Sequence, residues 1–197
     1  MTSNTDSIPG MDLNYSKPKL PKSNPDEEKK KFEKTKKEID KLKVFLTKKF
    51  KYILAMGILP PQSIPKFIEE EEAPPESKDH VHIQIIVPDE KVKEIPKIKQ
   101  EIVKEIQKSK EKVWAHIMTP SEIWEICMNQ KFELSGAIAM SYPLYDKGIL
   151  GALRVSEIHK SLVLQKFEKY VVSYVIGGSL VRGDAVKTSD VDVFVII

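Results

Sequence analysis

The chain has 197 residues, of which 41% are hydrophobic and 31% charged, and its formal net charge is +3. This length and composition predict one domain, or one domain and part of another, with enough apolar residues for a packed core. The small net charge excludes binding to nucleic acid or membrane through charge alone. A single cysteine, Cys127, excludes a disulfide bond within the chain. The sequence shows no signal-peptide pattern and no apolar run of about 18 residues, so a cytoplasmic protein is expected.

The first part of the chain predicts a tail followed by a long helix. Residues 1–24 are rich in Ser, Asn, Pro and Lys without periodicity, which predicts a disordered tail. Asn24 and Pro25 are typical of a helix start, and the predicted helix runs to about Lys49. Its narrow apolar stripe consists of Phe32, Ile39, Leu42 and Leu46. Its many lysines favour a solvated face, with nucleic-acid binding as the alternative.

The middle of the chain predicts strands that alternate with helices. Tyr52 to Met56 resemble a short buried strand, which Gly57 and the following prolines are expected to end. Residues 60–79 contain prolines and an acidic run, which predicts a loop with about one helical turn. The next predicted elements are a strand from His80 to Val87, a helix from Pro96 to Ser109 and a strand from Val113 to Met118.

From Thr119 onward the pattern predicts two further helices and two further strands. Thr119 and Glu122 form a capping-box signature, which opens a short helix that ends at Met128. A strand is expected from Leu134 to Met140, followed by a turn at Pro143 and Gly148. A helix is expected over residues 149–167, with Leu150, Leu153, Ile158, Leu162 and Leu164 largely inward, and then a strand from Tyr170 to Ile176. This alternation predicts an α/β layered fold.

The last of these strands leads into Gly177-Gly178-Ser179. Glycine lets the backbone turn sharply and lets a ligand approach the main-chain amides. If residues 179–185 begin a helix, their free N–H groups form an anion site, and the Ser179 hydroxyl adds a donor. The stretch therefore predicts phosphate binding.

Asp190 and Asp192 follow this loop, two residues apart. On a strand that begins near Ser189, their carboxylates point to the same face. Two carboxylates beside a phosphate site are suited to hard divalent ions such as Mg²⁺. Two such ions can activate an attacking hydroxyl and stabilise a leaving pyrophosphate. The alternative without chemistry is a hairpin whose aspartates are merely exposed.

Other ligand-binding motifs fit this segment poorly. Gly183 is followed by Asp184 and Ala185, whereas a P-loop requires Lys followed by Ser or Thr. The spacing also fails for a dinucleotide-binding fingerprint, and the glycine and glutamate of an EF-hand loop are missing. These three alternatives are excluded.

Gly178-Ser179, a spacer and Asp190-Val191-Asp192 with apolar flanks resemble the signature of the DNA polymerase beta-like nucleotidyltransferase superfamily. The segment is especially similar to the archaeal and minimal nucleotidyltransferases. The resemblance implies an α+β fold with a small mixed sheet flanked by helices. It also implies transfer of a nucleoside monophosphate from a nucleoside triphosphate to a hydroxyl of nucleic acid, protein, antibiotic or small molecule.

The resemblance carries over to particular residues of this sequence. Gly178 and Ser179, with Gly177 before them, would hold the triphosphate, and Arg182 would assist. Asp190 and Asp192 would be catalytic and would bind two Mg²⁺ or Mn²⁺ ions. The family places a third carboxylate on a later strand, which this chain does not reach. Truncation of a longer protein is therefore expected, with an oligomer or partner covering the apolar edge strand from Val193 to Ile197.

A weaker echo of the same unit lies upstream. Lys49 to Leu59 are similar to Lys166 to Gly178, and His80 to Ile86 stand where Asp190 to Ile196 stand. The hypothesis is a degenerate nucleotidyltransferase-like domain over residues 44–165. The predicted organisation is thus a tail (1–24), an α/β domain (25–165) and the start of a catalytic domain (166–197).

In that upstream copy, histidines replace the aspartates. His80, His82 and His116 are candidate ligands of a transition metal. The favoured alternative is that they are ordinary polar residues of strands in an inactive site.

Two functions follow for the chain. The first is a metal-dependent nucleotidyltransferase that is incomplete in this chain. The second is a catalytically inactive binding or interaction module built on the same fold.

Overall fold

The computed structural model describes residues 25–108 and 112–197. The predicted tail over residues 1–24 lies outside the described residues, as does Ser109 at the predicted end of a helix. The side chain of Phe32 in the predicted apolar stripe is also outside the described part. The helices are α1 (Pro25–Lys49), α2 (Ile64–Glu70), α3 (Ile95–Ile106), α4 (Pro120–Met128), α5 (Phe132–Ala139), α6 (Ile149–Phe167) and α7 (Gly178–Arg182). Three short 3₁₀ segments are η1 (Pro61–Ser63), η2 (Pro75–Asp79) and η3 (Asp89–Glu94).

The strands form two sheets. The strands are β1 (Ala55–Ile58), β2 (Val81–Ile86), β3 (Val113–Met118), β4 (Tyr142–Asp146), β5 (Ser173–Ile176) and β6 (Val193–Ile196). The first sheet has the order β3-β2-β1-β4, in which β1 is antiparallel to β2 and β4, and β2 is parallel to β3. The second sheet is the antiparallel pair β5-β6. The small mixed sheet flanked by helices confirms the predicted fold class.

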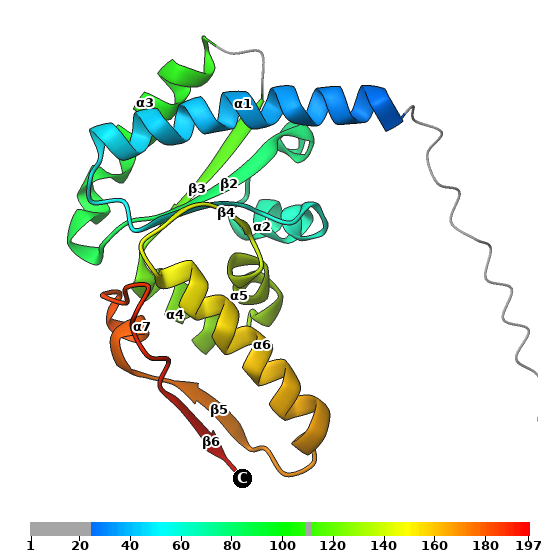
Figure 1. Ribbon diagram of the computed structural model, residues 1–197, viewed down its shortest axis with the longest axis vertical. Helices are drawn as coiled ribbons and strands as arrows, with labels where there is room; N and C mark the ends of the chain where they lie inside the picture. Colours follow the sequence, from blue (N-terminus) through cyan, green and yellow to red (C-terminus); the bar gives the residue numbers. More distant parts are fainter. Residues whose placement is uncertain (1–24, 109–111) are drawn as a thin grey trace, which may run out of the picture.

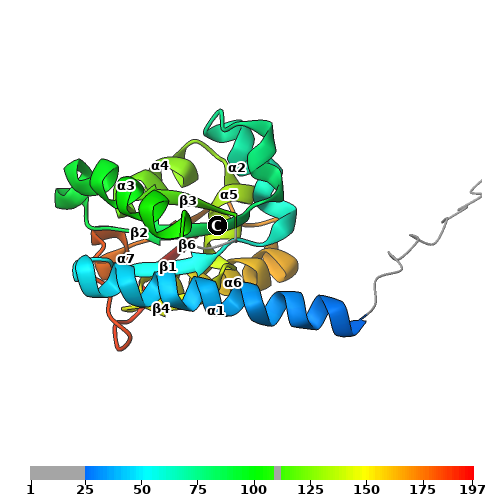
Figure 2. The same ribbon diagram turned by 90° about the horizontal axis from the view of Figure 1, so that it is seen from above.

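The four-stranded sheet lies between two layers of helices (Figures 1 and 2). Side chains alternate between the two faces of a strand, so neighbouring residues of β1 and β2 enter different cores. Met56 and Ile85 pack with residues of α1 and α3, while Ala55 and Ile86 pack on the opposite face with residues of α4, α5 and α6. The β5-β6 sheet lies beside α6, at the opposite end of the molecule from α1 (Figure 1).

The prediction of a strand from Leu134 to Met140 is wrong. These residues form α5, whose first residue is Phe132. A short apolar run fits a buried strand and a buried helix equally well. Leu134 and Ile138, four residues apart, are both buried, as expected for one face of a helix.

The roles predicted for several prolines and for Gly57 are also wrong. Pro143 lies within β4, at the edge of the sheet, where a missing N–H is tolerated. Residues 60–79 contain α2 as well as two 3₁₀ segments, and prolines stand in the first turn of each. Gly57 does not end a strand but pairs with Gln84 inside β1.

Two boundaries and one burial pattern differ from the sequence prediction. The chain turns after α1, with the N–H of Ile53 bonded to the carbonyl of Phe50 (3.0 Å), so β1 begins at Ala55 and not at Tyr52. A similar turn after α6 makes β5 begin at Ser173. On α6, Leu150 and Leu153 are buried as predicted, but Ile158 and Leu162 are exposed. The second half of α6 extends past the four-stranded sheet (Figure 1), which explains this exposure.

Candidate functional site

The turn between β5 and α7 is built around Gly178. Gly177 has extended backbone, whereas Gly178 has a φ of +70°, a conformation that residues with a side chain rarely adopt. A Cβ added at Gly178 would overlap Oδ2 of Asp192. The absence of a side chain at this position therefore lets the carboxylate of Asp192 lie directly against the first residue of α7.

Asp192 is held there by the backbone. The N–H of Gly177 donates to the carbonyl of Asp192 (2.9 Å), one step beyond the last ladder pair, Ile176 with Val193. The structure therefore brings together the predicted glycine turn and one of the two predicted metal-binding aspartates. Within the described part of the chain, neither Asp190 nor Asp192 has a side-chain hydrogen bond or ion pair, and both are exposed.

The prediction that Asp190 and Asp192 lie within a strand is wrong. β6 begins at Val193, so both aspartates precede it. Between them, Val191 turns inward and packs against the core formed by α4, α5 and α6. β5 ends at Ile176, the partner of Val193, and the chain then turns into α7, so the aspartates have no strand beside them with which to pair.

Ser179 and Arg182 occupy opposite ends of α7. Ser179 follows Gly178 in the first turn, and its carbonyl accepts the N–H of Asp184 (3.1 Å). Arg182 stands in the last turn, and its Nε donates to Oδ2 of Asp184 at 3.3 Å. Both members of that pair are exposed, and an exposed pair contributes only about 0.2–1 kcal/mol. The structure thus places Ser179 beside the site and directs Arg182 toward Asp184.

Residues far upstream in the sequence hold α7 in place. The indole N–H of Trp124 on α4 donates to the carbonyl of Val181 (2.8 Å). Leu180 is 1% exposed and belongs to the same core as Ile123 of α4 and Leu150 of α6. The role of Trp124 cannot be predicted from the sequence, because no local pattern links this residue to the glycine turn.

The loop that carries the aspartates is anchored at the start of α6. Gly148, with a φ of +146°, lies against the backbone of Val186 and Lys187, where any side chain would collide. Val186 and Ser189 close the loop with two hydrogen bonds of 2.9 Å, and Ala185 is buried. The position of Asp190 and Asp192 therefore depends on the first turn of α6.

The Trp124→Phe variant should weaken this support selectively. The phenyl ring retains most of the packing but cannot donate to Val181, so the free energy of unfolding should fall by about 0.5–1.5 kcal/mol. The affinity of the phosphate site that the sequence predicts at the glycine turn should fall with it, since α7 is less restrained. Urea denaturation and calorimetric titration measure the two effects. Trp114→Phe is the control, and equal affinities of the two variants would contradict the role of Trp124.

The histidines form a different arrangement from a metal site. Nδ1 of His82 lies 2.8 Å from Nε2 of His116, whose Nδ1 lies 2.7 Å from Oε1 of Glu71. Nε2 of His82 bonds to the carbonyl of Ser77 (2.8 Å). His80 lies outside this chain of hydrogen bonds and stacks beside Trp114. Among the described residues, no group of three His, Cys, Asp or Glu side chains is arranged to hold a metal ion. The metal hypothesis for His80, His82 and His116 therefore fails. Glu71 is a partner of His116 that the sequence did not predict.

This network, in which both histidines are buried, predicts a loss of stability in acid. Burial lowers the pKa of His82 below its ordinary value, although its bond to Ser77 opposes the shift. Burial acts to raise the pKa of Glu71, but the hydrogen bond and charge of His116 hold it below its ordinary value. The unfolded chain therefore binds these protons first as the pH falls, so stability drops below about pH 6.5 through His82 and further below about pH 4.3 through Glu71.

Denaturation at several pH values checks this expectation. His82→Gln should flatten the loss of stability between about pH 6.5 and 5, where His82 titrates in the unfolded chain. His159→Gln changes an exposed histidine outside the network and should keep the slope of the unmodified chain. The same slope in both variants would exclude His82 as its source.

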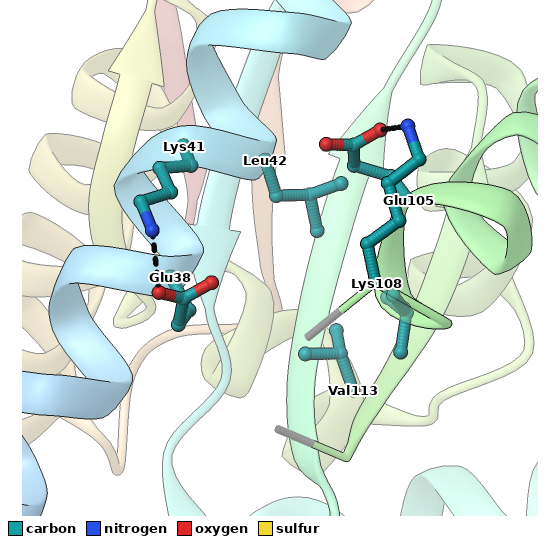
Figure 3. A pocket seen from close by; sticks show the side chains of 7 residues that line it. Glu38, Lys41, Leu42, Glu105, Lys108 and Val113 are labelled. Atoms are coloured by element: carbon teal, nitrogen blue, oxygen red, sulfur yellow. Dashed lines mark hydrogen bonds and ion pairs between the residues drawn. The ribbon is translucent and has the colours of Figure 1, made fainter. Parts of the chain in front are cut away.

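A shallow pocket lies on the other side of the molecule, between α1 and α3 (Figure 3). Its volume is about 170 Å³, and Leu42 and Val113 form part of its wall. The charged groups at its rim are paired with residues three positions away in the chain, Lys41 with Glu38 and Lys108 with Glu105, each at 2.7 Å. These pairs leave the rim little free charge for a ligand, so the glycine turn is the stronger candidate site.

The comparisons with known proteins agree with this choice. Residues 156–197 match the family model of the nucleotidyltransferase domain. The matched segment begins in α6 and contains β5, α7 and β6, and thus every residue of the site from Gly177 to Asp192. The nucleotidyltransferase match supports a general transferase function for this segment. Comparisons with curated proteins and with solved structures gave no match. Among the described helices, none has both the length and the apolar character that a membrane span requires.

Proposed function

We propose that the chain carries the nucleotide-binding and metal-binding part of a metal-dependent nucleotidyltransferase of the DNA polymerase beta-like, archaeal or minimal type. The reaction transfers a nucleoside monophosphate from a nucleoside triphosphate to a hydroxyl of an acceptor, which is a nucleic acid, a protein or a small molecule. One observation carries the proposal: because Gly178 has no side chain, the carboxylate of Asp192 can lie directly against the start of α7. A cation ligand and free main-chain amides thereby share one site.

The residues present fit a divalent cation. Asp190 and Asp192 are exposed and unpaired within the described residues, and Mg²⁺ is commonly bound by one or two carboxylates together with substrate phosphates. Two Mg²⁺ or Mn²⁺ ions, when bound, would neutralise the triphosphate and favour attack by the acceptor hydroxyl.

The remaining site residues would bind the triphosphate. The first N–H groups of α7 have no partner within the helix, and Gly177, Gly178 and Ser179 supply them or lead into them. The hydroxyl of Ser179 can donate a further hydrogen bond. Arg182 would reach a phosphate only by leaving Asp184. Because an exposed ion pair is weak, breaking it costs little free energy.

The alternative is a binding module without activity, and two observations favour it. The described residues place no third carboxylate beside Asp190 and Asp192. The β5-β6 sheet also leaves large apolar side chains in solvent, with Phe194 63% and Ile196 51% exposed. Such a surface suits a partner or a second chain that covers the sheet. Transfer of label from a nucleoside triphosphate to an acceptor distinguishes the two functions.

Titration of the full chain with a nucleoside triphosphate in the presence of Mn²⁺ or Mg²⁺ tests the binding step. Asp190→Asn and Asp192→Asn should each abolish metal-dependent binding, because each removes a charged ligand but preserves side-chain size. Glu168→Gln, at an exposed carboxylate just after α6, is the matched control and should bind as the unmodified chain does. Binding that survives both aspartate changes would refute the metal assignment.

A further inference from the structure

Two segments of the chain share one order of elements. In the first, α1 is followed by β1, a connection with η1, α2 and η2, and then the antiparallel strand β2. In the second, α6 is followed by β5, a connection with α7, and then the antiparallel strand β6. The same number of residues separates the end of α1 from β1 and the end of α6 from β5, and both strands have four residues. The agreement extends to the helices, which the sequence echo alone did not include.

The strand pairing has the same register in both segments. Ala55 pairs with Ile86 at one end of β1, as Ser173 pairs with Ile196 at one end of β5. All four ladder pairs correspond in this way, up to Ile58 with Ile83 and Ile176 with Val193.

The hydrogen bonds that flank the ladders correspond as well. On one side, Leu54 N–H to Ile86 O matches Val172 N–H to Ile196 O, both at 2.8 Å. On the other side, Leu59 N–H to His82 O matches Gly177 N–H to Asp192 O, both at 2.9 Å. His82 therefore occupies the position of Asp192, and Leu59 that of Gly177.

We infer that residues 25–86 and 149–196 are two copies of one unit, and that in the first copy a closed network of Glu71, His116 and His82 has replaced the ligand site. The second copy retains the open site around Asp192. The comparison with a metal site rests on the proposed function, whereas the equivalence of the two backbones does not.

The first copy cannot bind phosphate at its turn. Counting onward from the matched pair Leu59 and Gly177, Pro60 and Pro61 stand at the positions of Gly178 and Ser179. Proline has no N–H, so two of the main-chain donors available in the second copy are missing. Leu59, at the position of Gly177, is buried in the hydrophobic core.

The positions of the ring protons explain why this network needs no metal ion beside Glu71. The carbonyl of Ser77 only accepts, so Nε2 of His82 donates to it and Nδ1 of His82 accepts from Nε2 of His116. Glu71 as a carboxylate accepts from Nδ1 of His116. His116 therefore carries both ring protons, and its positive charge takes the place of an ion beside the carboxylate. His80 and Lys99 are the other charged or titratable groups that act on this network.

The network also gives the first copy a structural role. Glu71 caps the end of α2 and Ser77 belongs to η2, while His82 and His116 stand on β2 and β3. The three side chains thus fasten the α2-η2 connection to the sheet. The first copy serves as a support for the second, and only the second binds a nucleotide.

Histidine ring NMR on the full chain, labelled with ¹⁵N, tests the network. The ring signals should show the protons that these hydrogen bonds require, with one on Nε2 alone of His82 and one on Nδ1 of His116 facing Glu71. One equivalent of Zn²⁺ should leave both sets of signals unchanged. A His82 ring protonated on Nδ1 alone, or a shift of both rings with Zn²⁺, would overturn the inference.

Two variants sharpen this measurement. Glu71→Gln keeps the size of the side chain but removes its charge, so the Nδ1 signal of His116, which faces this side chain, should move from its position in the unmodified chain. Glu72→Gln changes the neighbouring exposed carboxylate and should alter nothing. An unchanged Nδ1 signal of His116 in Glu71→Gln would contradict the role of Glu71.

Nucleotide stoichiometry separates this inference from the proposed function. One nucleotide per chain, lost in Asp192→Asn, supports both. Two nucleotides per chain would overturn the inference of a closed first copy. A chain that binds none contradicts the proposed function, and the inference is then decided by the histidine signals.

Discussion

Replacement of Gly178 by alanine should weaken metal-dependent nucleotide binding by roughly 5- to 150-fold, which corresponds to about 1–3 kcal/mol of backbone strain at a positive φ. The added methyl group cannot occupy its position while the carboxylate of Asp192 remains where it is. Either α7 or Asp192 must move, and both belong to the site. Calorimetric titration with nucleotide and Mn²⁺ measures the loss.

The matched control for this change is Gly136→Ala. Gly136 lies in α5, where a Cβ would have ordinary room, 3.8 Å from the nearest atom of Glu157. Alanine is also the better helix former, so this variant should bind nucleotide normally and be slightly more stable. Equal affinities of the two variants would show that the contact between Gly178 and Asp192 does not define the binding site.

Replacement of Gly148 by alanine should reduce both stability and nucleotide affinity. A left-handed φ at a residue with a side chain costs about 1–3 kcal/mol, and here the methyl group would also collide with backbone atoms of Val186. Backbone atoms cannot rotate away as a side chain can, so the loop that precedes Asp190 must shift. Urea denaturation should show the lower free energy of unfolding, and titration the weaker binding.

Gly151→Ala is the control on the same helix. A Cβ at this position would lie 3.4 Å from Oδ2 of Asp146, which is ordinary contact. This variant should retain the stability of the unmodified chain or exceed it, because alanine has less backbone freedom to lose in a helix. A Gly148→Ala protein as stable as Gly151→Ala would show that the aspartate loop does not depend on this contact.

The sequence predicted the elements with strong local signals. α1, α6 and β3 have the predicted bounds, and both halves of the capping box at Thr119 and Glu122 are formed. Long helices with a regular apolar period, and strands whose residues alternate, can be predicted from the local sequence alone. The prediction failed for α5, whose small and apolar residues fit either structure. For α2 it was too short, since a loop with about one helical turn was expected and the helix has seven residues.

The candidate site was predictable to the extent that it is local. Gly178 and Asp192 belong to one motif, and the structure brings them together. Trp124 and Gly148 come from other parts of the chain, and their roles depend on packing that no sequence spacing encodes. The role of Glu71 could not be predicted either, because it is one of several acidic residues in a row. Its partner His116 lies on another strand, 45 residues further along the chain.

The hydrogen bond between Trp124 and Val181 means that the intrinsic fluorescence of the chain can report on the position of α7. Indole emission responds to the bond that its N–H makes, and Trp124 donates directly to the helix that opens the site. The sequence contains two tryptophans, so Trp114→Phe leaves Trp124 as the sole fluorophore. Any rearrangement of α7 in the proposed nucleotide complex would then be visible as a change in emission, without an attached dye.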